Sequence, residues 1–273
     1  MNPHNTSLFC RALRLYVKLV GASVRSRMQY PFDFIASLLI QAVMVLYDFV
    51  LIAVILWRFT SIASWDIYEV GALYAVSRLG FGLYRLFCNE LDRFEAYIVR
   101  GEFDSMLVRP WPSLLTLLSR NLDLGRMSWI VQGIGVMAVC LPALLRRGSL
   151  DMWGALMLLA CSVLSLALFA AVGLATASAA FWIVRIEELQ VFTVHAPGTA
   201  SLYPLDIYPG WLRNLLLTVL PVGVGNYIPC VYLLGKGGSW LNLVVPPVWA
   251  AICLLAAYRL WRLAETRYHS TGS

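Results

Sequence analysis

The residues best suited to chemistry lie between Glu90 and Pro112, where charged side chains crowd between two long apolar runs. The charged members are Glu90, Asp92, Arg93, Glu95, Arg100, Glu102, Asp104 and Arg109. Apolar side chains are interleaved with them, a pattern typical of a short amphipathic helix that ends at Pro110 and Pro112. Such a segment is either a solvated connection or, as the interleaving favours, a surface that docks into a cleft on a partner protein.

The other chemically capable side chains form no recognisable catalytic or metal-binding motif. His4, His195 and His269 are not spaced with carboxylates as metal ligands, nor with a serine as a nucleophilic site. No GxxxxGK[ST] phosphate-binding loop occurs, and the six cysteines include no CxxC pair. We therefore expect no catalytic activity, metal or cofactor in this chain, so that any ATP and Mg would be bound by another protein.

The composition excludes a soluble domain. The chain has 273 residues, of which 60% are hydrophobic and only 13% charged, whereas about a quarter are charged in an average globular protein. Its apolar runs approach the ~20 residues that a helix needs to cross a bilayer, which predicts an all-α membrane protein. The net charge of +6 is expected to reflect membrane topology, so we expect no nucleic-acid partner.

We expect six membrane-spanning helices in one membrane domain of residues 31–273. The predicted spans are residues 34–57, 68–87, 114–141 and 152–184, a weakly apolar fifth that begins at Glu187, and 241–261. The charged loop of residues 90–113 joins the second and third spans. Pro204, Pro209 and Pro221 break the segment of residues 204–235, which predicts a re-entrant hairpin before the last span.

The basic residues predict the orientation of these spans. Residues 1–30 form a predicted amphipathic interfacial helix, with Arg11, Arg14, Lys18 and Arg25 on one face of a helical wheel. With six spans, 15 lysines and arginines fall on the side of the termini and the charged loop, and five fall on the other. By the positive-inside rule, both termini and the loop of this multi-pass protein are expected in the cytoplasm.

Two charges fall inside the predicted spans. Asp48 lies near the middle of the first and Arg78 near the middle of the second, so antiparallel neighbours would bring them to a similar depth. A lone charge at that depth costs at least ~2.5 kcal/mol, which favours an ion pair facing the protein interior. The pair is either purely structural or part of a substrate cavity.

Three blocks of sequence resemble a bacterial family of type-2 ABC exporter permeases, those similar to viologen exporters. The first is RGEFDSMLVRP, from Arg100 to Pro110. The second is YPLDIYPGWLRNLLLTVLPVGVGNYIPCVYLLG, from Tyr203 to Gly235, and the third is RYHSTGS, from Arg267 to Ser273. The blocks occur in the family's order, and the likeness covers nearly the whole chain. It implies a multi-pass protein of a bacterial inner membrane.

The resemblance implies partners and a mechanism. Two such permeases, commonly different paralogues, would join two copies of a separately encoded cytoplasmic ABC ATPase. The permease family's coupling helix, which docks on the ATPase, falls on Arg100, Gly101, Glu102, Phe103 and Asp104. The hairpin around Pro204, Pro209 and Pro221 would close the outer end of the translocation path. The implied function is ATP-driven export of a small amphipathic, cationic or lipid-like compound.

Two other classes of function remain open from the residues alone. An ion-coupled secondary transporter would use Asp48, Arg78, Glu187 and Glu188 as coupling groups, but it predicts an internal repeat, and the two halves of the sequence show none. A membrane scaffold without transport activity would need neither an ATPase nor turnover.

Overall fold

The described part of the chain is almost entirely helical. The computed structural model describes residues 64–120, 126–183 and 185–268, together with the backbone of residues 61–62 and a few separate positions between residues 32 and 50. The predicted interfacial helix of residues 1–30 lies outside these residues, as does Asp48. The elements are β1 (Ser61–Ile62), β2 (Trp65–Asp66), α3 (Ile67–Phe87), α4 (Asn89–Asp92), α5 (Phe94–Val99), α6 (Asp104–Leu107), α7 (Ser113–Leu118), α8 (Met127–Arg146), α9 (Met152–Ser178), η2 (Ala179–Phe181), α10 (Glu187–Gln190), η3 (Val191–His195), α11 (Ala196–Ala200), η4 (Leu205–Ile207), α12 (Gly210–Leu217), α13 (Val222–Leu233) and α14 (Leu241–Thr266).

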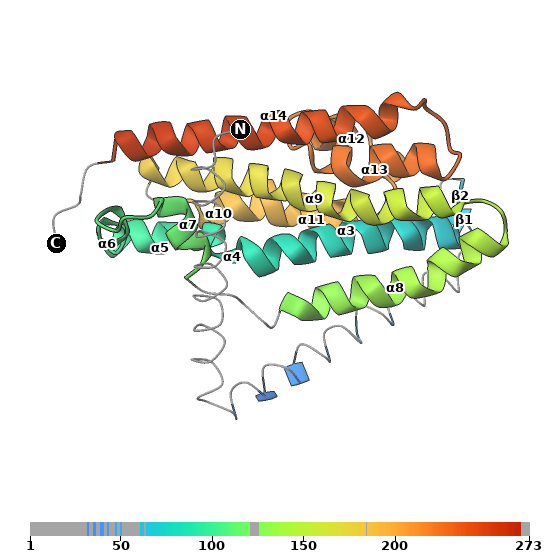
Figure 1. Cartoon of the computed structure of the whole chain (residues 1–273), viewed down its shortest axis with the longest axis horizontal. Helices are drawn as coiled ribbons and strands as arrows, with labels where there is room; N and C mark the ends of the chain where they lie inside the picture. Colours follow the sequence, from blue (N-terminus) through green and yellow to red (C-terminus); the bar gives the residue numbers. More distant parts are fainter. Residues whose placement is uncertain are drawn as a thin grey trace, which may run out of the picture.

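The long helices form an elongated bundle with α3 at its centre (Figure 1). α3 packs against α8, α9 and α13, and it buries nearly all of its residues. Its charged side chains Glu69, Arg78 and Arg85 are each only 8% exposed. Because a charge facing lipid is costly, this helix needs protein neighbours on every side.

Glycines let these helices approach closely. A Cβ atom at Gly80 of α3 would lie 2.4 Å from the Cβ of Ser165 and 2.9 Å from the carbonyl oxygen of Ser162, both on α9. At Gly225 of α13, a Cβ would lie 3.0 Å from the Cα of Ser165. Small residues at helix crossings bring the backbones together and so increase van der Waals packing, the main attraction between helices in lipid.

Three of the described helical segments are long and apolar enough to cross a membrane: Met127–Arg146, Met152–Phe181 and Leu241–Thr266. They confirm an all-α membrane protein. They also match the predicted third, fourth and sixth spans, except that the third begins at Met127 instead of residue 114. The leucines of α7 extend the apolar run toward the N-terminus, but α7 is a separate short helix that ends at Leu118.

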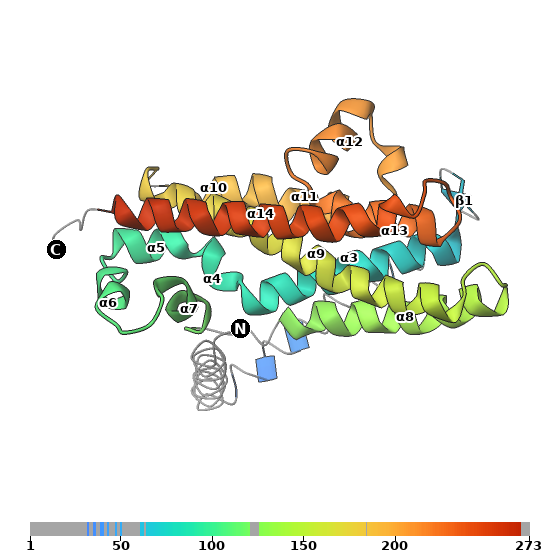
Figure 2. The same cartoon turned by 45° about the horizontal axis from the view of Figure 1, so that its top comes forward.

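The segment predicted as a re-entrant hairpin, for which we keep the name hairpin, contains two helices, α12 and α13, that bend by 103° relative to each other. Figure 2 shows α12 standing away from the bundle, whereas α13 packs against it. Pro204, Pro209 and Pro221 are the residues that immediately precede η4, α12 and α13. Proline is tolerated there because the first N–H groups of a helix have no intrahelical partner, so these prolines separate the pieces of the hairpin.

A polar network joins the hairpin to the end of the bundle that carries β1 and β2 (Figure 1). Asp206 accepts hydrogen bonds from Trp65 Nε1 at 3.1 Å and from the Tyr227 hydroxyl at 2.7 Å. Arg213 of α12 lies 3.2 Å from the same carboxylate. Asp206 therefore connects β2, α12 and α13, the elements at this end.

The close contact at Gly80 can be tested by substitution. We expect Gly80→Ala to destabilise the protein by about 1–3 kcal/mol, because the added methyl group overlaps the side chain and backbone of α9. Gly135→Ala is the matched control, since nothing lies within 4 Å of its Cβ position on α8. Thermal unfolding in detergent should show a loss only for Gly80→Ala, and equal stabilities would contradict the packing described here.

Candidate functional site

The charged segment lies at the end of the bundle opposite β1 and β2. α4, α5, α6 and α7 gather there beside the last turns of α14 and the start of α10 (Figure 1). This end is therefore built from three parts of the chain. They are α4 to α7, which precede α8, the start of α10, which follows α9, and the end of α14. A polar cap that contacts several helices in this way can pass a force to all of them.

The five predicted coupling residues form the turn between α5 and α6. Arg100 ends α5, and Gly101 follows with φ of +66°, a left-handed conformation that strains any other residue. Glu102 and Phe103 then lead to Asp104, the first residue of α6. The short amphipathic helix expected from the sequence is therefore two short helices joined at a glycine.

Phe103 anchors this turn to the bundle. Its side chain is completely buried in a cluster of aromatic rings contributed by α5, η2, α14 and the residues after α14. The ring centroids lie 5.3 Å from Phe94, 5.3 Å from Phe181 and 5.2 Å from Tyr268, all in edge-to-face geometry. Such aromatic pairs add about 0.5–1.5 kcal/mol each beyond the burial of their area. Phe103 thus holds the turn from inside and is not available to a partner.

Charged contacts fix the rest of the turn. Glu102 lies 2.6 Å from Arg120 and 3.9 Å from Arg100, and the Arg120 guanidinium stacks on the ring of Tyr97 at 4.7 Å. The Tyr97 hydroxyl donates a hydrogen bond to the buried carboxylate of Glu90. Burial, together with this hydrogen bond, raises the pKa of Tyr97. The hydroxyl therefore stays protonated at neutral pH and keeps its role as a donor.

Near the turn, five of the side chains that face solvent are apolar or basic. Val108 is 85% exposed, Val99 57% and Leu107 42%. Arg100 and Arg109 are exposed beside them in the sequence. We call these five residues the tip side chains. Exposed apolar residues with flanking arginines are typical of a surface that becomes covered by another protein.

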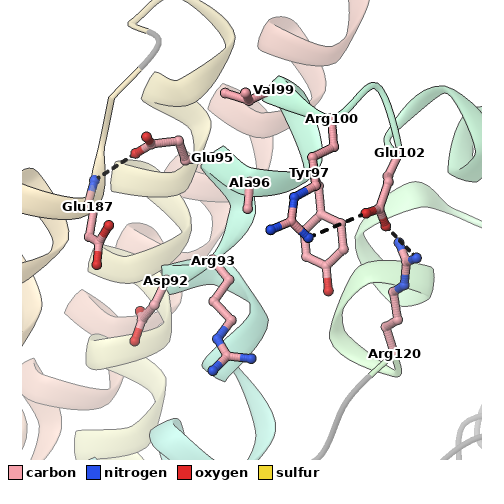
Figure 3. A pocket seen from close by; sticks show the side chains of 10 residues that line it. All are labelled: Asp92, Arg93, Glu95, Ala96, Tyr97, Val99, Arg100, Glu102, Arg120 and Glu187. Carbon is pink, nitrogen blue, oxygen red and sulfur yellow. Dashed lines mark hydrogen bonds and ion pairs between the residues drawn. The ribbon is translucent and has the colours of Figure 1, made fainter.

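A cleft of about 540 Å³ lies next to the turn. Figure 3 shows Asp92, Glu95 and Glu187 on one side of α5 and Tyr97, Arg100, Glu102 and Arg120 on the other. Both signs of charge line the cleft, which suits side chains of a protein better than a ligand of a single charge. Within the part of the chain that the structure describes, no group of His, Cys, Asp and Glu could hold a metal ion.

Asp92 and Glu95, which the sequence marked only as members of the charged segment, tie this end to the helix after α9. Asp92 of α4 accepts a hydrogen bond from the Tyr84 hydroxyl at 2.8 Å, forms an ion pair with Arg85, and lies 3.2 Å from His195 Nε2. Glu95 of α5 accepts hydrogen bonds from the backbone N–H groups at the start of α10. The partners are far apart in sequence, so only their charge could have drawn attention to them.

The predicted intramembrane ion pair lies partly outside the described residues. Arg78 Nε donates a hydrogen bond of 2.8 Å to Gln132 Oε1 of α8, and its guanidinium lies 4.9 Å from the ring centroid of Trp129. Both contacts are internal to the bundle, as expected for a charge at this depth. Pairing with Asp48 stays a prediction.

Comparison with known proteins gives one match. A family model described as ABC-2 family transporter protein matches residues 42–272. No curated protein and no solved structure matches the chain significantly.

The anchoring role of Phe103 predicts a large loss of stability. We expect Phe103→Ala to cost about 3 kcal/mol or more, because it leaves a cavity inside the aromatic cluster. Leu107→Ala, at an exposed position of α6, should change the stability little. Unfolding in detergent measures both variants, and a stable Phe103→Ala protein would show that the cluster does not hold the turn.

Proposed function

Because the chain belongs to the ABC-2 transporter family and is therefore a permease component of an ABC transporter, we propose that its charged end is the docking site for the ATPase. The family implies a partnership with a cytoplasmic ABC ATPase, which supplies the nucleotide chemistry absent from this sequence. In this proposal, ATP and Mg bind to two copies of that ATPase. The residues that face the ATPase are the tip side chains.

The observation that carries this proposal is the contrast between the two sides of the turn. The inward side is fixed by the aromatic ring of Phe103 and by the ion pair of Glu102 with Arg120. The outward side presents Val99, Leu107 and Val108 to solvent. A turn that is rigid toward its own protein and apolar toward the outside can transmit the motion of a docked partner.

The distribution of charge supports the proposed topology. The exposed basic residues Arg93, Arg100 and Arg109 lie at the charged end. At the other end Arg146 is exposed, and Arg147 and Lys236 form ion pairs with Asp66 and Glu69. This arrangement favours six spans with a cytoplasmic charged end and both termini in the cytoplasm of a bacterial inner membrane. The second span is then α3, and the fifth comprises α10, η3 and α11 followed by the hairpin.

The proposed mechanism is alternating access in a dimer of this permease with a second, paralogous or identical one. ATP binding closes the ATPase dimer, the turn at residues 100–104 shifts with it, and the path opens past the hairpin. The proposed cargo is a small amphipathic, cationic or lipid-like compound, as the resemblance to viologen-exporter-like permeases implies. An apolar cavity of about 580 Å³ between α9, α13 and α14 suits the apolar part of such a compound.

Docking can be tested at exposed positions, which avoids the internal ion pair of Glu102. We expect the double variant Val108→Glu, Arg109→Glu to lose its ATPase by about tenfold or more, since burying two unpaired carboxylates in an interface costs more than about 1.4 kcal/mol. The measurement is the amount of ABC ATPase, and of ATP hydrolysis, that co-purifies with the tagged chain.

Arg146→Glu is the matched control, an exposed charge reversal at the opposite end of the bundle. This variant should keep the ATPase. Full retention of the ATPase by the double variant would remove the docking assignment, as would equal losses from the double variant and the control.

A further inference from the structure

The helix that follows α9 starts with α10, and its first residues are in contact with the charged segment. The carboxylate of Glu95 on α5 accepts hydrogen bonds from the backbone N–H groups of Ile186 at 2.7 Å and Glu187 at 3.1 Å. Figure 3 shows the bond from Glu187 to Glu95 at the edge of the cleft. The first N–H groups of a helix have no intrahelical acceptor, and the positive end of the helix dipole favours a carboxylate there. The Glu95 carboxylate therefore supplies a hydrogen-bond acceptor and a negative charge at the N-terminus of this helix.

Further contacts hold this helix over its next turns, both to the charged segment and to α9. Gln190 Nε2 donates hydrogen bonds to the carbonyl oxygens of Leu91 at 3.3 Å and Gly173 at 3.2 Å. His195 Nε2 lies 3.2 Å from the carboxylate of Asp92. The charged segment thus contacts this helix at its first residue, at Gln190 and at His195.

The helix changes its geometry between the contact at Gln190 and the contact at His195. Residues 191–195, which form η3, are a π-helix, and Pro197 follows at the start of α11. π-Helical turns are rare and often occur at functional sites, and proline removes an N–H donor from the helix. The run of residues 187–200 is therefore in contact with the charged segment as far as His195, and its π-helical turn and Pro197 make its geometry less regular from residue 191 onward. We call this run the α10–α11 helix.

The far end of the α10–α11 helix leads directly to the hairpin. The Tyr208 hydroxyl donates a hydrogen bond of 3.1 Å to the carbonyl oxygen of Ala200. The next carbonyl, of Ser201, accepts hydrogen bonds from the Ser77 hydroxyl at 2.7 Å and from Asn226 Nδ2 at 3.4 Å. These donors belong to the loop before α12, to α3 and to α13. One helix thus joins the charged segment, which contacts its start, to the hairpin, which contacts its end.

We propose that Glu95 is the positioning residue through which movement of the charged segment reaches the hairpin, by way of the α10–α11 helix. The proposal rests on the docking of the ATPase proposed above and adds the path that the movement takes inside this chain. Glu95 touches neither nucleotide nor cargo. When the charged segment shifts, its carboxylate carries the start of the α10–α11 helix along, the π-helical turn absorbs part of the change, and the hairpin at the other end is repositioned.

The experiment uses the complex of this chain with its ATPase in nanodiscs, where both sides are accessible. Val219→Cys places a thiol at an exposed position between α12 and α13, and its reaction with a maleimide is compared with that of the chain lacking this cysteine. In this parent complex, ATP should change the labelling rate by about twofold or more, as expected for a population shift of the hairpin. The readout requires no knowledge of the cargo.

Glu95→Ala in this parent should keep the bound ATPase and its ATP hydrolysis but lose the effect of ATP on labelling. Glu95→Gln should retain part of the effect, because its amide oxygen still accepts a hydrogen bond, without the strength that charge adds. Glu188→Ala is the matched control, since this carboxylate is exposed in the same first turn and forms no hydrogen bond or ion pair with α5 in the described residues. The control should respond to ATP like the parent.

Three results would overturn the proposal. The first is a normal ATP response in Glu95→Ala. The second is loss of the ATPase from Glu95→Ala, because Glu95 would then act in docking. Retention of the ATPase by the double variant Val108→Glu, Arg109→Glu would instead count against the proposed docking site. The third is a parent hairpin that does not respond to ATP, since no movement would then reach it. If the Glu95→Ala chain itself does not fold, the first result is read from Glu95→Gln, whose response to ATP must then be weaker than that of the parent.

Discussion

The structure depends on the burial of a charged helix in the middle of a membrane protein. α3 carries Glu69, Arg78 and Arg85, and lipid offers none of these groups a partner. The bundle solves this by surrounding α3 with α8, α9 and α13, close enough at Gly80 that no Cβ fits. Arg78 contacts Gln132 and Trp129 of α8, and Glu69 pairs with Lys236. The helices packed against α3 can then be more apolar, and α9 carries no charged residue.

The same helix connects the two polar ends of the molecule. At one end Tyr84 and Arg85 hold Asp92 of the charged segment, and at the other Asp66 caps the start of α3 and pairs with Arg147. Between these ends, Ser77 contacts the carbonyl oxygen of Ser201, where the α10–α11 helix ends. A central helix with fixed contacts at both ends provides a frame against which a second helix can move.

The sequence predicted the elements of this fold better than their limits. Apolar runs near the length of a bilayer located α8, α9 and α14, and the prolines located the breaks of the hairpin because each precedes a helix. The start of the third span was wrong, since the leucines of α7 are as apolar as those of a span, and apolarity does not reveal where a helix stops. The first span and the pairing of Asp48 with Arg78 stay predictions.

For the site, the sequence located the turn but did not show which of its side chains are buried and which face solvent. The charges and the resemblance both pointed to Arg100 through Asp104, and the structure places these residues together between α5 and α6. Phe103 was expected to face a partner, but its neighbours Phe181, Trp261 and Tyr268 come from distant parts of the chain. The contact of Glu95 with the start of α10 has no local signature either, because its acceptor role appears only when two distant segments meet.

The central claim is that the charged end of the bundle faces an ATPase, and cross-linking from a single position tests it most directly. A photoreactive amino acid at position 108, the most exposed of the tip side chains, would be activated in a complex that hydrolyses ATP. The account predicts a covalent product with the ATPase from position 108 and none from position 219 in the hairpin. A complex that hydrolyses ATP and yields no such product from position 108, or yields it equally from position 219, would contradict the account.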